Sequence, residues 1–182
     1  CINKYDKAID DYNRIIAIDP NNALAYSNRA KVYFKKYEFN KAITDYTKAI
    51  KNNPNLELEN DYFGEINTSI IERGNAYLYI NEYDKAINDY NKALEKNFSF
   101  MFSSIFYNRG FAYANKCEYE KAISDYTNAI KVNLNYEQAY FSRGNIYFNK
   151  TEYDKAIFDY TRAIEINPMY GEAYFNRGFA YA

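Results

Sequence analysis

The sequence predicts an all-helical (all-α) fold, a solenoid built from antiparallel helix pairs. The first observation is a twelve-residue stretch, Tyr83–Leu94, of which the chain of 182 residues carries five versions. The alanine at its fourth position recurs at intervals of 34, 44, 36 and 34 residues. The second observation is that the apolar residues of each version fall on one face of an α-helix. A helical period near 34 residues indicates a solenoid, whose units bury their apolar faces against their neighbours.

Each version of the repeated stretch is expected to form the second helix of a pair, which we call helix B. In the version Phe39–Ile50, apolar side chains recur at spacings of three and four residues. A second helical pattern precedes each B helix, with Tyr26, Ala30 and Tyr33 as its first example. We call this segment helix A. The repeating unit is therefore helix A, a short turn and helix B.

Numbering each unit from the residue equivalent to Ala23 gives a small set of recurrent positions. Small residues recur at positions 8, 20 and 27, aromatic residues at positions 4, 11, 17 and 24, and proline at position 32. Small side chains let helices A and B approach closely, aromatic side chains fill the space around them, and proline ends helix B. Glycine inside a helix costs about 0.5–1 kcal/mol relative to alanine. The recurrent glycine at position 8 therefore indicates close packing.

This pattern resembles the tetratricopeptide repeat over nearly the whole chain, and the resemblance implies a right-handed superhelix. We expect a single solenoid over residues 1–182, with four full repeats at 23–56, 67–100, 103–136 and 137–170. Residues 1–22 would be helix B of a truncated repeat, residues 171–182 helix A of another, and residues 57–66 an insertion. The insertion is expected to be a connection or a longer helix in preference to a binding element. Because the chain begins and ends inside a repeat, we expect a fragment of a longer array, for which end-to-end self-association is possible.

Composition speaks against several classes of function. The chain has no histidine, and its two cysteines, Cys1 and Cys117, lack the spaced partners of a zinc site or a disulfide framework. We therefore expect no metal and no cofactor. A net charge of −1 gives no basic surface for nucleic acid, and no stretch is apolar enough to span a membrane. The compartment is unknown from the sequence, and a cytoplasmic one is favoured over secretion.

Charged residues recur with the repeat and do not form a unique catalytic pair. An aspartate precedes each position-24 tyrosine, and an arginine stands at position 7 of each helix A. We predict a ladder of Arg–Asp pairs, either between helices A and B or between adjacent repeats. The rival interpretation is that the arginines bind an anionic ligand. The arginines are Arg29, Arg73, Arg109, Arg143 and Arg177, and the aspartates are Asp11, Asp45, Asp89, Asp125 and Asp159.

The resemblance also implies that the A helices line an inner, concave groove. Asparagine and aromatic residues interleave at the positions that would face this groove. Asparagine pairs with peptide backbone through both donors and an acceptor, and aromatic rings offer stiff contact area. In a chain so rich in asparagine and tyrosine, composition alone is the competing interpretation. The candidate groove residues are Asn28, Lys31, Asn75, Tyr107, Asn108, Phe111, Phe141, Asn145, Phe148 and Asn176, and the same positions also include Ser27, Ile71 and Glu72.

The sequence therefore favours a non-catalytic scaffold that binds an extended protein or peptide ligand of unknown identity. The alternatives are the targeting or regulatory region of a larger enzyme and a self-assembling repeat module. One ligand class is disfavoured. Co-chaperone repeats of this family hold the carboxylates of chaperone tails through two lysines and an arginine. The equivalent positions here carry Ile71, Gln138 and Ser142, which offer no charge-assisted bond.

Overall fold

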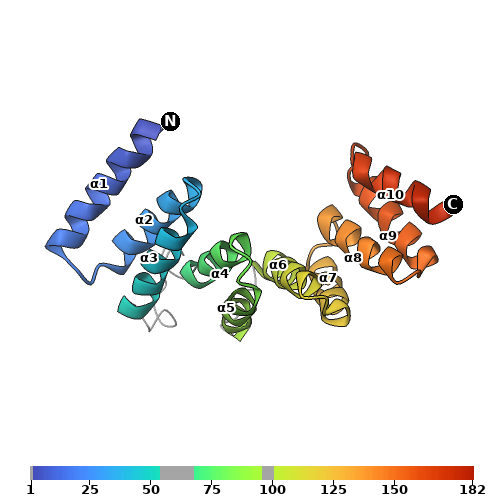
Figure 1. Ribbon diagram of the computed structural model, residues 1–182, viewed down its shortest axis with the longest axis horizontal. Helices are drawn as coiled ribbons and strands as arrows, with labels where there is room; N and C mark the ends of the chain where they lie inside the picture. The colour runs from blue at the N-terminus through green and yellow to red at the C-terminus, as the bar shows by residue number, and fades with distance from the viewer. Residues whose placement is uncertain (1, 54–67, 96–100) are drawn as a thin grey trace. The chain divides into compact units, whose positions relative to one another are not determined.

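A computed structural model describes residues 2–53, 68–95 and 101–182, with the backbone alone for residues 2 and 3. These described residues form ten α-helices and no strand (Figure 1). The helices are α1 (Ile2–Ile18), α2 (Ala23–Lys35), α3 (Phe39–Asn52), α4 (Ser69–Tyr79), α5 (Tyr83–Glu95), α6 (Phe102–Asn115), α7 (Tyr119–Val132), α8 (Glu137–Asn149), α9 (Tyr153–Ile166) and α10 (Gly171–Tyr181). The predicted insertion 57–66 lies outside the described residues. No helix among those described is long and apolar enough to cross a bilayer.

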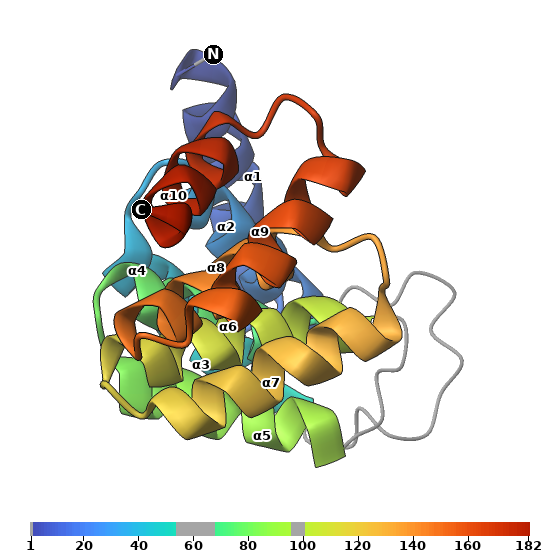
Figure 2. The ribbon, with the colours of Figure 1, turned by 90° about the vertical axis from the view of Figure 1, so that its right-hand side faces the viewer.

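The chain divides into two compact units, Cys1–Lys96 and Asn97–Ala182, which we call unit 1 and unit 2. Helices A and B pack in pairs, α2 on α3 and α4 on α5 in unit 1, and α6 on α7 and α8 on α9 in unit 2. Both ribbon views show α6 lying alongside α7 (Figures 1 and 2). Each B helix also contacts the next A helix of its unit, so α3 packs on α4 and α9 on α10. The predicted succession of helix pairs is confirmed.

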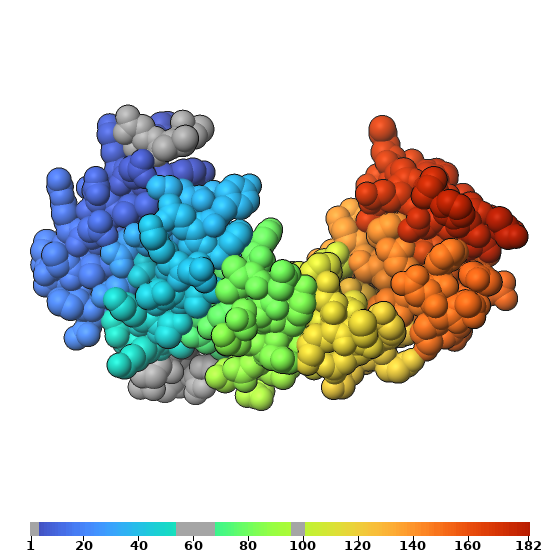
Figure 3. Space-filling view, viewed as in Figure 1, coloured from blue at the N-terminus to red at the C-terminus, as the bar shows by residue number. Residues whose placement is uncertain are grey.

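The small and aromatic positions make the core of each pair. The position-24 tyrosines Tyr46, Tyr90, Tyr126 and Tyr160 are at most 1% exposed, and in the same four repeats the alanines at positions 20 and 27 are completely buried. The position-8 glycines allow the close approach. A Cβ atom added to Gly74 would lie 2.9 Å from the Tyr90 ring, and one added to Gly144 would lie 2.9 Å from the Tyr160 ring. The space-filling view shows the region of α2 and α3 filled with atoms (Figure 3).

The turn between helices A and B has the same backbone geometry in four repeats. After α2, the Tyr37 N–H donates to the Phe34 carbonyl and the Glu38 N–H to the Tyr33 carbonyl, which is a Schellman motif. Its left-handed residue is Tyr37, Asn81, Cys117 or Thr151, each with φ of 60–61°. Glycine and asparagine are the residues that tolerate this conformation best. Cys117, which stands in this turn after α6, is an exposed free thiol.

Helix α9 ends where proline predicts. Pro168 comes two residues after Ile166, the last residue of α9. The Asn167 side chain then accepts a hydrogen bond from the Met169 N–H at 3.1 Å, and Asn133 does the same for Asn135 after α7. This Asx turn carries the chain from α7 into α8 and from α9 into α10.

Candidate functional site

The recurrent arginines and aspartates form the predicted ladder within repeats. Arg29 binds Asp45 through Nε at 2.6 Å and Nη2 at 2.8 Å, and Arg143 binds Asp159 in the same bidentate way at 2.8 and 2.7 Å. The side chains of the paired aspartates are 1–5% exposed. Hydrogen bonding to Asp45 raises the pKa of the Arg29 guanidinium against the opposing effect of burial. Each pair joins helix A to the helix B of the same repeat, and Arg73–Asp89 and Arg109–Asp125 complete the set.

The same arginines also reach the preceding repeat. Nη1 of Arg73 donates to Thr47 in α3 at 3.0 Å, and Nη1 of Arg143 donates to Thr127 in α7 at 2.8 Å. Arg177 makes the equivalent bond to Thr161 at 3.0 Å. A single guanidinium thus ties three helices together. The described Arg–Asp pairs lie between helices A and B of one repeat, and the bonds to the preceding repeat go to threonine. Because Asp45, Asp89, Asp125 and Asp159 take up the planar fork of their arginines, the geometry favours a structural role over anion binding.

The A helices of unit 2 carry most of the candidate groove residues. The A helices α6, α8 and α10 lie beside one another there. Tyr107 and Phe141 occupy the same repeat position, and each packs on the buried tyrosine of its own repeat, Tyr107 on Tyr126 and Phe141 on Tyr160. Phe141 also packs on Tyr170 with ring centroids 4.9 Å apart. The rings of Tyr107 and Phe141 are therefore half-buried and form part of the surface of α6 and α8.

Two asparagines on neighbouring A helices form an ordered amide pair. The Tyr160 hydroxyl donates to the Asn145 Oδ1 at 2.8 Å, and Asn176 Nδ2 donates to the same oxygen at 2.9 Å. Burial raises the pKa of Tyr160 to about 12, so its hydroxyl stays protonated as a donor at neutral pH. The two amides are held in fixed positions on α8 and α10, with the Asn145 Nδ2 and Asn176 Oδ1 atoms left for other partners.

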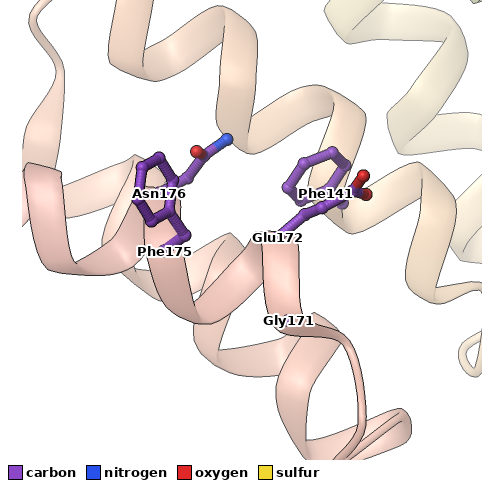
Figure 4. Close-up of a pocket in the computed structure, with 5 residues that line it drawn as sticks. All are labelled: Phe141, Gly171, Glu172, Phe175 and Asn176. Atoms are coloured by element: carbon purple, nitrogen blue, oxygen red, sulfur yellow. The ribbon is translucent and has the colours of Figure 1, made fainter.

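A hollow of about 450 Å³ lies between α8 and α10 beside this amide pair. It is lined by Phe141, Gly171, Glu172, Phe175 and Asn176. Figure 4 shows the Phe141 ring on one side of the hollow and the side chains of Phe175 and Asn176 on the other. The Phe175 side chain is 66% exposed. The sequence pattern did not single out Glu172, because no other repeat has an acidic residue at this position.

The remaining candidates of unit 2 lie in different surroundings. Phe111 is 43% exposed on α6, and Asn108 is half-buried on the same helix. Phe148 points toward the turn and packs edge-on against Tyr153 with ring centroids 5.5 Å apart. It also borders the core cluster around Tyr160 and Ala180. Phe148 therefore contributes to packing between helices of the fourth repeat.

Unit 1 carries the other candidate residues, on α2 and α4. Asn28, Lys31 and Asn75 are all half-buried. The Asn75 Oδ1 accepts a hydrogen bond from the Tyr90 hydroxyl at 2.7 Å, which repeats the Tyr160–Asn145 arrangement. Two neighbouring positions expected to face the groove are core positions instead, because Ile71 is 1% exposed and Ser27 is fully buried, bonded to Ser69 at 2.9 Å.

The described residues contain no group of three or more histidine, cysteine, aspartate or glutamate side chains that could hold a metal ion. The buried carboxylates of the repeats are held by arginine, and the amide side chains at the inner positions are neutral. The surface is therefore suited to hydrogen bonding and to contact with aromatic rings.

Comparison with known proteins gives two family models that match the chain and describe the same repeat. A family model described as tetratricopeptide repeat matches residues 23–56, 71–100 and 103–136, and a second, described as TPR repeat, matches residues 2–36 and 144–182. No curated protein matches the chain. Among solved structures, MamA superimposes with a TM-score of 0.79 and 25% identity, over 90% of this chain and 89% of that one.

Two further structures are described by what they bind. YrrB, described as a TPR protein with an unusual peptide-binding site, has a TM-score of 0.72 and 23% identity, over 93% of this chain and 81% of that one. At this identity the likeness concerns the fold alone. The first TPR of Spaghetti (RPAP3), bound to an HSP90 peptide, has a TM-score of 0.59 and 29% identity, over 63% of this chain and 90% of that one. The chain belongs to the tetratricopeptide-repeat family, and its helix pairs form a solenoid of the kind that serves as a protein-interaction scaffold.

Proposed function

We propose that the chain is a non-catalytic scaffold that binds an extended polypeptide along the inner surface of its A helices. In unit 2 this surface consists of α6, α8 and α10, with Asn145 and Asn176 at its centre. The observation that carries the proposal is the amide pair, in which Tyr160 fixes Asn145 and Asn145 in turn fixes Asn176. Fixed side-chain amides present a donor and an acceptor without further loss of rotamer freedom on binding.

The hollow beside the amide pair would take one side chain of the ligand. Its volume of about 450 Å³ is within the range of ligand pockets, and Phe141 and Phe175 line it with aromatic surface. Aromatic anchors in pockets of this kind carry a large share of the binding energy at protein interfaces. Backbone recognition by the amides and side-chain recognition by the hollow together describe an extended segment as the ligand.

The comparisons support a peptide ligand and the sequence argues against one kind of peptide. The Spaghetti domain binds a peptide with an acidic end, and at 29% identity it supports peptide binding as a property of this architecture. In this chain the positions equivalent to the cationic clamp carry Ile71, Gln138 and Ser142. We therefore expect a ligand that is held by amides and aromatic rings and is not held by its terminal carboxylates.

The proposal can be tested with a library of random twelve-residue peptides displayed on phage. The immobilised chain is used to select peptides, and the selected peptides are labelled and titrated by fluorescence anisotropy. We expect Phe175→Ala and Asn176→Ala each to weaken binding about tenfold or more, as interface anchors do. Circular dichroism checks that both variants remain helical.

Phe158→Ala is the matched control. Phe158 is 60% exposed, close to the 66% of Phe175, but it lies on α9 and lines a different hollow together with Arg143 and Tyr147. Its replacement should leave the affinity unchanged. Failure to select any peptide, or equal binding by all three variants, would contradict the proposed function.

A further inference from the structure

The arginine ladder is incomplete at α10. In the fourth repeat, Arg143 binds Asp159 of its own helix B with Nε and Nη2, and it binds Thr127 of the preceding helix B with Nη1. Arg177 on α10 makes the second of these bonds, from Nη1 to Thr161 at 3.0 Å. Its Nε and Nη2 atoms have no aspartate partner in the described part of the chain, in which no helix B follows α10.

The ladder has the opposite gap at α1. This helix is a helix B, and Arg29 on α2 donates to its Asn13 in the way that Arg143 donates to Thr127. Asp11 holds the position that the paired aspartates have in the other repeats, but it is exposed, and no arginine among the described residues binds it. The carboxylate that α10 lacks is therefore present and accessible on α1.

The face of α10 that would meet a helix B is open. Tyr174, at position 4, is 47% exposed, whereas its equivalent Tyr140 is 6% exposed. A Cβ atom added to Gly144 would lie 2.9 Å from the ring of Tyr160, the position-24 tyrosine of its own repeat. At Gly178 no described atom lies within 4 Å of an added Cβ. In α10 the place that a position-24 tyrosine fills in the fourth repeat is therefore empty.

The face of α1 carries what would fill this place. Tyr12, at position 24, is half-buried, whereas its equivalent Tyr46 is fully buried. Ala8, at position 20, is also half-buried, whereas Ala42 is fully buried. Ala42 and Tyr46 pack with Ala30 of α2, the helix A of their own repeat. The exposed face of α1 is therefore the one that a helix B turns toward its own helix A.

We propose that α10 of one copy of the chain pairs with α1 of a second copy, as helix A pairs with helix B inside a repeat. The Asp11 carboxylate of the second copy accepts hydrogen bonds from Nε and Nη2 of Arg177, and the Tyr12 ring packs over Gly178. A cationic fork thus meets a carboxylate, and a ring fills the space beside a residue that has no side chain.

The sequence of α1 makes a second copy the partner. A helix that completes the repeat of α10 needs a small residue, an aspartate three residues later and a tyrosine directly after it, and α1 has Ala8, Asp11 and Tyr12 in this order. The first and last helices of the chain are thus the two surfaces of one contact (Figure 1). Because these surfaces differ, the contact is heterologous and can continue from a second copy to a third.

Sedimentation velocity of the chain over the micromolar concentration range is the first measurement. The average mass should rise with concentration, because the contact joins different copies. A mass that stays at the value of the monomer up to the highest soluble concentration would overturn the inference.

Two variants each block one end of the contact. Gly178→Leu places a side chain where the Tyr12 ring of the second copy lies, and it should weaken self-association about tenfold or more. Asp11→Arg places a like charge opposite Arg177 and should weaken self-association about hundredfold or more. Both residues have open surroundings in their own copy, so circular dichroism should show an unchanged helix content.

Asp10→Arg is the matched control for Asp11→Arg. The change in charge is the same and the two residues are neighbours, but Asp10 stands at position 22. This position is exposed in α1 and also in α3, α5, α7 and α9, where its residues are Thr44, Asn88, Ser124 and Phe158. Asp10→Arg should associate as the wild type does. An equal loss in both variants would show an effect of net charge, and the pairing of Asp11 with Arg177 would be overturned.

Mixing the two blocked variants tests the direction of the contact. The Gly178→Leu chain keeps an intact α1, and the Asp11→Arg chain keeps an intact α10, so one native contact forms between them. We expect a heterodimer that grows no further and that neither variant forms alone. A contact between two α10 helices would persist in Asp11→Arg alone, and a contact between two α1 helices would persist in Gly178→Leu alone. Either result would overturn the inference.

This inference does not depend on the proposed function, because no peptide enters these experiments. If the chain stays a monomer and still binds the selected peptides, self-association alone is overturned. If the chain associates as described and binds no peptide, the proposed function alone is overturned. Unfolding of variants at Gly178 is measured at concentrations where the chain is a monomer, so that no second copy covers the residue.

Discussion

Replacing Gly144 by alanine tests the close approach between helices A and B. A Cβ atom at this position would lie 2.9 Å from Cε1 and 3.1 Å from Cδ1 of Tyr160, and 3.2 Å from Cβ of Asp159. Neither neighbour can easily move away. The Tyr160 ring is fully buried with its hydroxyl bonded to Asn145, and the Asp159 carboxylate is held by Arg143.

The expected magnitude combines two opposing effects. Forcing a methyl group into a packed contact costs about 1–3 kcal/mol, and alanine gains about 0.5–1 kcal/mol over glycine inside a helix. Gly144→Ala should therefore lower the free energy of unfolding by about 0–2.5 kcal/mol. Ala30 occupies the equivalent place in α2 and is fully buried, so the first repeat accommodates a methyl group and the lower half of this range is favoured.

Gly178→Ala is the matched control in the same unit. Gly178 stands at the same repeat position in α10, but no atom of the described structure lies within 4 Å of an added Cβ. Here only the helix preference acts, and the variant should be more stable by about 0.5–1 kcal/mol. Urea unfolding followed by circular dichroism measures both variants. If Gly144→Ala were stabilised as much as Gly178→Ala, the argument from close packing would be refuted.

Three further predictions concern the turns, the ion pairs and the groove. Thr151→Gly should raise stability by about 0.5–1 kcal/mol, because Thr151 is a β-branched residue at φ 60° in the Schellman turn, and thermal unfolding would show no gain if the turn were unstrained. Asp159→Asn should cost about 3 kcal/mol in urea unfolding because it leaves the Arg143 charge buried and unpaired, whereas Glu165→Gln in an exposed ion pair should change the free energy of unfolding by less than about 0.5 kcal/mol. Burial raises the pKa of Glu72, so its ionisation destabilises the fold increasingly as the pH rises through the unfolded and then the folded pKa. Glu72→Gln should therefore raise the melting temperature at neutral pH and leave it unchanged well below the unfolded pKa, and an equal effect at both pH values would contradict the assignment.

The repeat register could be predicted from the sequence because the contacts of a solenoid are short in sequence. Each arginine pairs with an aspartate sixteen residues later in the same repeat, as in Arg29–Asp45 and Arg143–Asp159. The small and aromatic positions are likewise neighbours within one helix pair. Partners that recur at a fixed distance along the chain appear as a pattern in the sequence, and the pattern indicated both the fold and the ladder.

The candidate groove could be predicted only as a set of positions. Position 9 holds asparagine in both α4 and α8, but the sequence does not show that Asn75 and Asn145 receive the hydroxyl protons of Tyr90 and Tyr160. Nor does it show that Phe148 packs toward Tyr153 or that Ile71 is buried. The direction of a side chain at a helix surface depends on the space that the neighbouring helices leave for it. The spacing of residues along the sequence does not show that space.

The sequence by itself determined the helical class, the order of helices A and B and the residue types at the packing positions, because helix periodicity and side-chain size act locally. The tertiary structure decided how the polar groups are used. It joined Arg73 and Arg143 to helix B of the preceding repeat, through hydrogen bonds to Thr47 and Thr127. It also left the Tyr46 hydroxyl without an acceptor where Lys31 replaces asparagine. Hydrogen bonds require distances near 3 Å and aligned donors, and only the packed arrangement of several helices fixes both.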